Sequence, residues 1–542
     1  MPKHTTPLSK EQILGSWLED YSDLAAAFVV LTGFLARLWA ASGTFLNPDE
    51  ALHFRLANQM SLALANKQAL TAAHPPLLIL LLYFWHDLGT SELWLRLPSV
   101  IAGSVFCWIF YKWLAGATNR LTGFIGLLFV ACLPPIVGLT AEIRQYALLL
   151  AFLGCALYFL DRAFAERSAS LMVAFSFFLY LAMLTHYSAF LFAAALGIYA
   201  FLKIVSERPP LKVVSVWAIG QLLGLSLAVF LYKVHLSHLG AGDSRTVLQG
   251  FMSEFYLHRS YYDSAHDSPV RFLIGHSFGV FQFFFGQLAV GDVAGLLFLV
   301  GVASLLWDRG SPENTISGRH KAPLLLLPFA IACIASLGHV YPYGGTRHVA
   351  FLIIPGVAGV SVALTRLAAG RWNRGMALTL FVLVLCLIFG KPRPPRMDRR
   401  DQSRTQMTAA MEFVRQNIPP SSVIFVDYQT DLILGNYLCR QQPIALDASV
   451  SGFESFSCGG YRIISADYKT AEIFSSENFV REWDRLVTAY ALKPGEAVWI
   501  FQCGWGIKLA AELRGHFAEF RDLRVTSFGK NIQIFPLRVG QT

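Results

Sequence analysis

The chain has 542 residues, of which 55% are hydrophobic and 15% are charged, and its mean hydropathy is +0.48. A soluble domain usually carries about 25% charged residues, so this composition excludes a soluble globular protein over most of the length. The net charge of +9 comes from Lys and Arg in short connections between apolar runs. Since these residues form no basic stripe interleaved with aromatics, nucleic acid is excluded as a partner.

The first part of the chain is a series of apolar runs that predict transmembrane helices. A helix needs about 20 apolar residues to cross the hydrocarbon core of a bilayer. Two runs are doubtful, because 74–85 opens with His74-Pro75-Pro76 and 270–288 is interrupted by His276, Gln282 and Gln287. The runs lie at 24–41, 74–85, 97–115, 122–140, 146–161, 171–185, 187–205, 213–232, 270–288, 291–307, 323–340, 347–365 and 376–390.

The basic connections between these runs predict the topology, because Lys and Arg favour the cytoplasmic side. They fall on one side only if neither doubtful run crosses, which predicts about eleven full spans plus re-entrant or juxtamembrane helices, or up to about thirteen if both cross. Residues 1–20 are then a cytoplasmic segment and residues 21–391 the membrane domain. The outer face collects most of the unusual polar segments, namely Asp49-Glu50, His74-Pro75-Pro76, 142–146, 185–187, 236–269 and 341–348. Such convergence is what an active site requires.

Residues 392–542 have a different character and predict a small extracytoplasmic α/β domain after the basic linker Lys391–Arg396. Strand-like and helix-like runs alternate there, as in small α/β domains. The expected strands are 423–426, 498–501 and 532–535, and the expected helices are 477–490 and 507–517. Cys439 and Cys458 are expected to form a disulfide if this part is extracytoplasmic.

The acidic pair Asp49-Glu50 lies shortly after the first apolar run, in Asn47-Pro48-Asp49-Glu50, and precedes His53 on a short amphipathic helix. A plain helix cap is one interpretation, since Asn47 and Asp49 are good N-cap residues. The functional interpretation is a general base, because a carboxylate can take the proton from an attacking hydroxyl. Adjacent acids do not share a helix face, so one is expected to do chemistry and the other to support it. The pair could also hold a divalent cation, but no second acidic cluster completes a cage.

Further polar residues on the same predicted face are candidates for binding substrate, each with a structural alternative. Prolines at a helix start explain Pro75 and Pro76 but not His74. Arg347 suits a phosphate through its guanidinium fork, although it could instead extend to the membrane interface. Arg96 could be an interfacial anchor, Glu142 and Arg144 an internal ion pair, and His186 a structural histidine. The full set of candidates is His53, His74, Arg96, Glu142, Arg144, Tyr146, His186, Tyr343, Arg347 and His348.

Four elements in this order resemble the membrane glycosyltransferases of the GT-C superfamily. They are Asp49-Glu50, His74-Pro75-Pro76-Leu77, Arg96-Leu97-Pro98-Ser99 and Glu142-x-Arg144-x-Tyr146. The resemblance covers roughly residues 20–390 and is closest to the branch of protein O-mannosyltransferases and lipid A aminoarabinose transferases. The chain departs from the eukaryotic mannosyltransferases in lacking their extra lumenal repeats, and it lacks the Trp-Trp-Asp motif of oligosaccharyltransferases.

The resemblance implies an inverting glycosyltransferase of the bacterial inner membrane, with its C-terminal domain in the periplasm or outside the cell. It implies a polyprenyl-phosphate-linked sugar as donor, a lipid, glycan or protein as acceptor, membrane lipids as surroundings and no required cofactor. Asp49 is then the catalytic base with Glu50 beside it, and Arg144 and Arg347 are candidates for holding the donor phosphate. Two alternatives stay open: a transporter or flippase of lipid-linked sugars, and a non-catalytic lipid-binding assembly subunit.

Overall fold

The structure is a computed structural model that describes residues 20–239, 257, 259–307, 321–390, 402–439, 448–450, 452–466, 476–505, 507 and 509–540. The predicted linker 391–396 lies outside the described residues, as do residues 1–19 of the predicted cytoplasmic segment and most of 240–258. Among the described residues, the elements as far as Phe389 are helices, and one sheet follows in the C-terminal part.

Within the described residues, eight helices are long and apolar enough to cross a membrane. They are α2 (Ser22–Ala41), α6 (Glu92–Ala117), α9 (Tyr146–Ala165), α11 (Ser188–Glu207), α12 (Leu211–Leu231) with the π-helical turn η2 (Tyr232–Leu236), α15 (Leu288–Trp307), η5 (Arg347–Leu352) continued by α17 (Ile353–Leu367), and α18 (Trp372–Phe389). Shorter apolar helices are α7 (Arg120–Cys132), α10 (Ala169–Met183) and α16 (Lys321–Leu337), and α14 (Pro269–Phe285) is of similar length. The polytopic helical fold is confirmed, while the number of full spans stays a prediction.

The span predicted at 122–140 is broken in two. Helix α7 ends at Cys132, and α8 (Pro134–Leu139) begins at the two prolines, which cannot donate to the preceding turn. Buried Arg37 of α2 compensates for the break, because it donates to the carbonyls of Val130 and Ala131 and to the hydroxyl of Thr140. A cation therefore satisfies backbone groups that would otherwise lack partners inside the membrane.

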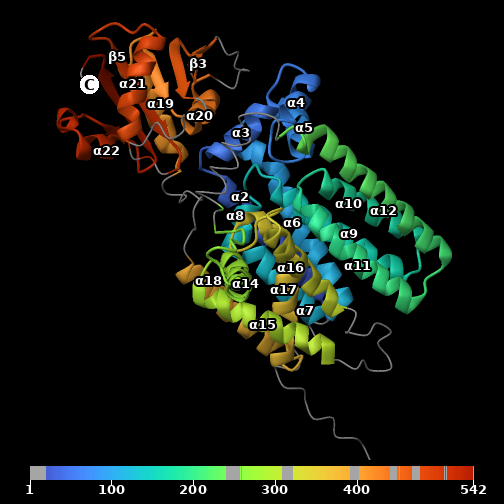
Figure 1. Cartoon of the computed structure of the whole chain (residues 1–542). Coiled ribbons are helices and arrows are strands. Elements are labelled where there is room, and N and C mark those ends of the chain that lie inside the picture. Colours follow the sequence, from blue (N-terminus) through green and yellow to red (C-terminus); the bar gives the residue numbers. More distant parts are fainter. Residues whose placement is uncertain are drawn as a thin grey trace, which may run out of the picture.

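Three short helices lie at one end of the long helices, and Figure 1 shows them in blue, with α3 nearest the C-terminal domain. They are α3 (Pro48–Ala57), α4 (Leu62–Ala69) and α5 (Leu77–Trp85), with the 3₁₀ turn η1 (His86–Leu88) after α5. Helix α3 carries the acidic pair and contacts α4, α5 and the C-terminal domain.

The C-terminal domain is built on a seven-stranded sheet with the order β2-β3-β4-β1-β5-β7-β6. Its strands are β1 (Val423–Val426), β2 (Ala448–Val450), β3 (Phe453–Cys458), β4 (Tyr461–Ala466), β5 (Ala497–Cys503), β6 (Thr526–Ser527) and β7 (Ile532–Arg538). The central strands β4, β1 and β5 are parallel and the outer pairs are antiparallel. The helices are α19 (Arg404–Asn417), α20 (Tyr428–Tyr437), α21 (Ser476–Ala489) and α22 (Leu509–His516), with the 3₁₀ turn η7 (Ala518–Phe520).

The predicted α/β domain is confirmed, including its first, fifth and last strands. The hairpin of β3 and β4 was not predicted from the sequence; it turns at Gly459 and Gly460 with φ of 58° and 88°. Only glycine adopts such angles readily. The predicted disulfide between Cys439 and Cys458 is present and joins the end of α20 to the end of β3.

Candidate active site

The acidic pair lies in the first turn of α3, whose start is determined by local sequence. Asn47 is the N-cap: its side chain accepts a hydrogen bond from the backbone of Glu50 at 3.0 Å, and Glu50 accepts one from the backbone of Asn47 at 3.0 Å. Pro48 occupies the first helical position, where its missing N–H costs nothing. This reciprocal capping box gives the turn a defined geometry.

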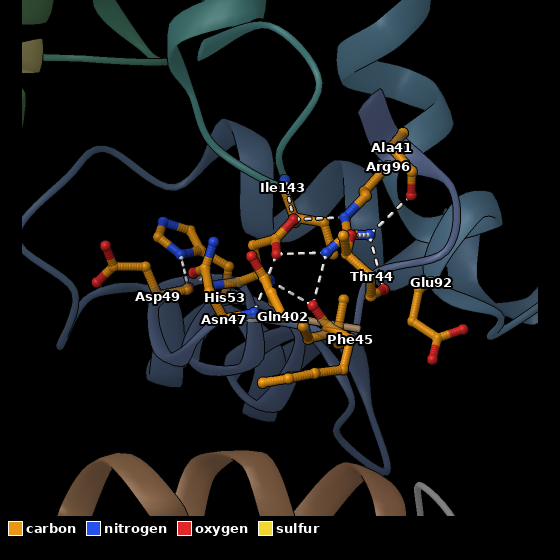
Figure 2. Close-up of polar contacts among 12 residues, drawn as sticks. Ala41, Thr44, Phe45, Asn47, Asp49, His53, Glu92, Arg96, Ile143 and Gln402 are labelled. Carbon is orange, nitrogen blue, oxygen red and sulfur yellow. Dashed lines mark hydrogen bonds and ion pairs between the residues drawn. The ribbon is translucent and has the colours of Figure 1, made fainter. Parts of the chain in front are cut away.

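Glu50 and Arg96 form a buried ion pair, and Figure 2 shows the guanidinium of Arg96 with its further bonds to Ala41 and Thr44. The guanidinium donates from Nε to Oε1 at 2.7 Å and from Nη2 to Oε2 at 2.6 Å, and the backbone N–H of Ile143 adds a third bond to Oε1 at 3.0 Å. The Glu50 and Arg96 side chains are 0% and 2% exposed. The pair is therefore fully enclosed, a condition under which loss of one partner is costly.

The remaining donors of Arg96 serve the loop before α3. They bond to the carbonyls of Ala41, Thr44 and Phe45 and to the Thr44 hydroxyl, at 2.8–3.1 Å. This geometry gives Arg96 a structural role in place of the predicted contact with substrate. It also gives Glu50 the supporting role, since its oxygens are occupied by Arg96, Asn47 and Ile143.

Asp49 faces a different environment and pairs with two arginines brought from distant segments. Its Oδ2 lies 3.0 Å from Nη1 of Arg144, in the bend after α8, and 2.7 Å from Nη2 of Arg347, at the start of η5. The Asp49 side chain is 21% exposed, so it is accessible from outside the protein core. Burial raises the pKa of Asp49, but the charges of Arg144 and Arg347 outweigh burial and lower it to about 2.

A row of aromatic rings lines the same region. His53 and His74 stack with centroids 6.4 Å apart, and His74 and His186 stack at 4.8 Å. The ring of Tyr146 follows at 5.3 Å from His186. The row connects α3, the turn before α5, the turn before α11 and the start of α9.

The histidines in this row are neutral at physiological pH. Burial, followed by the charge of Arg144, lowers the pKa of His53 to about 4 and that of His186 to about 3. Burial also holds the pKa of His74 well below its usual value. The proton positions follow from the bonds: His53 Nδ1 donates to the Asp49 carbonyl at 2.6 Å, and His186 Nδ1 accepts from the Ser188 backbone at 3.1 Å. The Nε2 of His186 is therefore the protonated nitrogen.

Several buried polar atoms in this region have no hydrogen-bond partner among the residues that the structure describes. They include Nε2 of His186, the hydroxyl of Tyr146, Nε of Arg144 and the side-chain amide of Gln145. Buried polar groups are nearly always satisfied, so this concentration points to a polar ligand. The guanidinium of Arg144 also lies 5.7 Å from the ring centroid of Tyr146. Together the groups supply positive charge, neutral donors and one carboxylate.

Three other predicted site residues, Glu142, His348 and Tyr343, lie in the segments that carry Arg144 and Arg347. The backbone N–H of Arg144 donates to the carbonyl of half-buried Glu142 at 2.7 Å, which tightens the bend. His348 is buried next to Arg347, and its carbonyl accepts a bond from Tyr341 at 2.9 Å. The hydroxyl of Tyr343 bonds to Ser277 at 2.7 Å, so it anchors the loop that precedes Arg347.

Gln145 and His235 lie near these groups but were not among the residues predicted from the sequence. Gln145 lies between the predicted Arg144 and Tyr146, and its position inside the Glu-x-Arg-x-Tyr element was the available signal. His235 belongs to no motif. Its Nε2 lies 2.8 Å from the carbonyl of Ala72 and its Nδ1 2.7 Å from the hydroxyl of Tyr187, so it braces the turn that carries His74. In the part of the chain that the structure describes, no group of three or more His, Cys, Asp or Glu is arranged to hold a metal ion.

Comparisons with known proteins bear on the fold and on part of the sequence. Residues 73–232 match the family model of dolichyl-phosphate-mannose-protein mannosyltransferase. ArnT from Cupriavidus metallidurans, solved with bound undecaprenyl phosphate, superposes with a TM-score of 0.55 at 13% identity, over 95% of this chain and 98% of that chain. The oligosaccharyltransferase of Archaeoglobus fulgidus, solved with Zn and sulfate, gives a TM-score of 0.48 at 13% identity, over 90% and 69% of the two chains. The sequence has no match among curated proteins.

These findings define the class of protein. It is an integral membrane protein with the ArnT fold, and its segment 73–232 resembles the protein mannosyltransferases in sequence. The resemblance to GT-C membrane glycosyltransferases of the ArnT and protein mannosyltransferase type, drawn from the ordered motifs, is confirmed.

Proposed function

We propose that the protein is an inverting glycosyltransferase that moves a sugar from a polyprenyl-phosphate donor to an acceptor hydroxyl. The observation that carries this proposal is the pairing of Asp49 with Arg144 and Arg347, a carboxylate beside two cations. The fold it shares with ArnT, which was solved with undecaprenyl phosphate, supports a donor of the same chemical kind. The match of 73–232 to a dolichyl-phosphate-mannose-protein mannosyltransferase family supports the same class of reaction.

The reaction is a single displacement. The acceptor hydroxyl attacks the anomeric carbon, the bond from this carbon to the phosphate oxygen breaks, and the polyprenyl phosphate leaves with the electron pair. Asp49 takes the proton of the hydroxyl, and Arg144 and Arg347 stabilise the charge that develops on the phosphate. Arginine suits this task because its planar fork bonds two phosphate oxygens at once.

The electrostatics of Asp49 fit a base that becomes active when the donor binds. With both arginines on its carboxylate, Asp49 has a pKa of about 2 and is a weak base. A donor phosphate that draws Arg144 and Arg347 toward itself weakens both ion pairs. The pKa of Asp49 then rises and its basicity increases, because an opposite charge nearby is what held it low.

The orientation follows from the charge-based topology. The reaction takes place at the extracytoplasmic face of a bacterial inner membrane, with the C-terminal domain in the periplasm or outside the cell, and no cofactor is required. The acceptor is a lipid, a glycan or a protein that presents a hydroxyl at that face, and the transferred group is a hexose or a pentose.

The test is Asp49→Asn in purified full-length protein with radiolabelled polyprenyl-phosphate sugars and a membrane extract as the acceptor source. We expect the transfer rate to fall by about 10²–10⁴-fold, the usual contribution of a general base, while the fold and binding of undecaprenyl phosphate are retained. Asp23→Asn is the matched control, because Asp23 bonds to Tyr111 and Lys112 at the far end of α2. Full transfer by Asp49→Asn would refute the catalytic assignment. Movement of labelled lipid across liposomes without any acceptor would favour the flippase alternative.

A further inference from the structure

The C-terminal domain holds the loop that precedes the acidic helix. Residues 402–404 pair with this loop through the backbone. The N–H of Phe45 donates to the carbonyl of Gln402 at 3.0 Å, and the N–H of Arg404 donates to the carbonyl of Gly43 at 2.9 Å. Thr44 and Ser403 form an antiparallel bridge between these two bonds. Several separate backbone contacts therefore bind a loop of the membrane domain to the start of the α/β domain.

Tyr437, at the end of α20, reinforces the same loop. Its hydroxyl accepts a bond from the N–H of Leu46 at 2.9 Å and donates to Oε1 of Glu92 at 3.0 Å. Tyr437 thus links the residue before Asn47 to the start of α6, the helix that carries Arg96. Two regions of the membrane domain are joined through one side chain of the C-terminal domain.

Helix α3 itself is tied to the domain by an ion pair. Nη1 of Arg55 lies 2.7 Å from Oδ2 of Asp431, and the two side chains are 25% and 2% exposed. Within the described part of the chain, the second carboxylate oxygen of Asp431 is buried without a hydrogen-bond partner, so Arg55 is its principal compensation. A buried carboxylate in this condition depends strongly on its cation.

The sheet presents to α3 the edge where the parallel strands end. Gly504 follows β5 with φ of +134°, and a Cβ there would lie 3.3 Å from Cγ of Pro48, the residue before Asp49. Helix α20, which follows β1 at the same edge, makes the contacts with α3. In α/β sheets this is the edge where ligands usually bind. In this protein it is occupied by the helix that carries the acidic pair.

We propose that Arg55, Asp431 and Tyr437 are positioning residues for Asp49, so that the C-terminal domain completes the active site. At about 100° per residue, Glu50 and Arg55 point about 140° apart around α3. Glu50 anchors the helix to the membrane domain and Arg55 anchors it to the C-terminal domain, and the two anchors together set the rotation of the helix. The direction of Asp49 toward Arg144 and Arg347 follows from that rotation. The effect on sugar transfer rests on the proposed function, whereas the effect on the position of α3 does not.

The test compares the intact protein with Asp431→Asn and Arg55→Met, which break the pair from opposite sides. Hydrogen exchange followed by mass spectrometry is expected to be at least about tenfold faster in residues 43–57 of both variants. Strands β1 and β5 are expected to keep their protection. Glu482→Gln is the matched control, because Glu482 pairs with Arg485 at 2.5 Å on α21 within the domain. Unchanged exchange of 43–57 in Arg55→Met would overturn the positioning role even if Asp431→Asn failed to fold.

The kinetic readout separates positioning from binding. We expect kcat for sugar transfer to fall by about 10–10²-fold in Arg55→Met, since a misplacement of about 1 Å can cost this much, with affinity for undecaprenyl phosphate within twofold of the unmodified protein. The exchanged pair Arg55→Asp with Asp431→Arg is expected to recover part of the loss. An unchanged kcat beside faster exchange would overturn the catalytic part of the proposal. Absence of transfer by the unmodified protein would count against the proposed function and leave the exchange result to decide the mechanical part.

Discussion

Asp49 and Glu50 are neighbours in the chain with opposite surroundings, and this contrast distinguishes their roles. Glu50 is enclosed by Arg96 and two backbone N–H groups, whereas Asp49 is partly exposed and its side chain pairs with Arg144 and Arg347. A carboxylate with all its oxygens in use supports the structure. When a carboxylate is paired with arginines, these arginines can leave it and bind a phosphate instead.

Arg347, one of the two arginines beside Asp49, gives the first prediction at this scale. Arg347→Lys keeps the charge but loses the planar fork, so affinity for undecaprenyl phosphate is expected to fall by about tenfold. The measurement is titration of the purified protein with undecaprenyl phosphate. Arg271→Lys, at an exposed position of α14, is the matched control. Equal affinities of Arg347→Lys and the unmodified protein would exclude Arg347 as a phosphate ligand.

The second prediction concerns a buried acid of the C-terminal domain. Burial raises the pKa of Asp427 to about 6. The folded state therefore binds this proton more tightly than the unfolded state, and the free energy of unfolding falls as pH rises from about 4 to about 6, then levels off. The total is on the order of 3 kcal/mol.

Asp427→Asn removes the charge but keeps a good N-cap for α20, where Asp427 now accepts from the N–H of Thr430 at 2.6 Å. We expect this variant to unfold at a higher temperature than the unmodified protein at pH 7.5, with a smaller difference at pH 4.5. Thermal unfolding followed by tryptophan fluorescence measures both. Asp522→Asn, at an exposed position, is the control. A lower unfolding temperature at pH 7.5 would contradict the assignment.

At the scale of elements, the break between α7 and α8 illustrates how a buried cation is used inside the membrane domain. An ionisable residue within a span often marks a transport pathway. Arg37 instead donates to carbonyls that the prolines leave without partners. Its role is to hold α2, α7 and α8 together, so it gives no support to a transporter.

Close packing around Arg37 gives the third prediction. A Cβ on Gly103 of α6 would lie 2.7 Å from Cβ of Thr140 and 2.9 Å from Nε of Arg37. Gly103→Ala is expected to displace this group and to lower stability by about 1–3 kcal/mol, the usual cost of overpacking. Gly116→Ala in the same helix is the control, because nothing lies within 4 Å of its Cβ position and alanine favours helix. Thermal unfolding in detergent is the measurement, and equal stability of the two variants would be the contrary result.

At the scale of the whole molecule, the chain consists of a membrane domain and an α/β domain that meet at α3. The disulfide between Cys439 and Cys458 lies in the α/β domain, at the end of the helix that supplies Asp431 and Tyr437. It therefore stabilises the face that contacts α3.

The fourth prediction follows from this position. Replacing Cys439 and Cys458 with serine is expected to destabilise the α/β domain by about 3 kcal/mol, the usual effect of opening a loop of this length. Hydrogen exchange of β3 and β4 is the measurement, and a reducing agent should leave the double variant unchanged. Exchange equal to that of the unmodified protein would show that the disulfide does not stabilise the domain.

The sequence predicted elements best where one local rule governs them. Apolar length identified the membrane helices, and β1, β5 and β7 were recognised as buried apolar runs. The β3–β4 hairpin was missed because its polar and apolar residues alternate weakly and its turn depends on the backbone of Gly459 and Gly460. The prolines at the break were visible in the sequence, but the hydrogen bonds from Arg37 to the carbonyls before them were not.

By itself, the sequence determined the class of protein and the order of its motifs, because composition and apolar length are local properties, and it left Asn47 and Asp49 as alternative N-caps of the acidic helix. Only the tertiary structure decided which acid faces Arg144 and Arg347, and that Arg96 serves the loop before α3. It also showed that the C-terminal domain is bound to the acidic helix. These depend on contacts between residues separated by up to hundreds of positions, such as Asp49 with Arg347 and Arg55 with Asp431, and no local pattern encodes the distance between them.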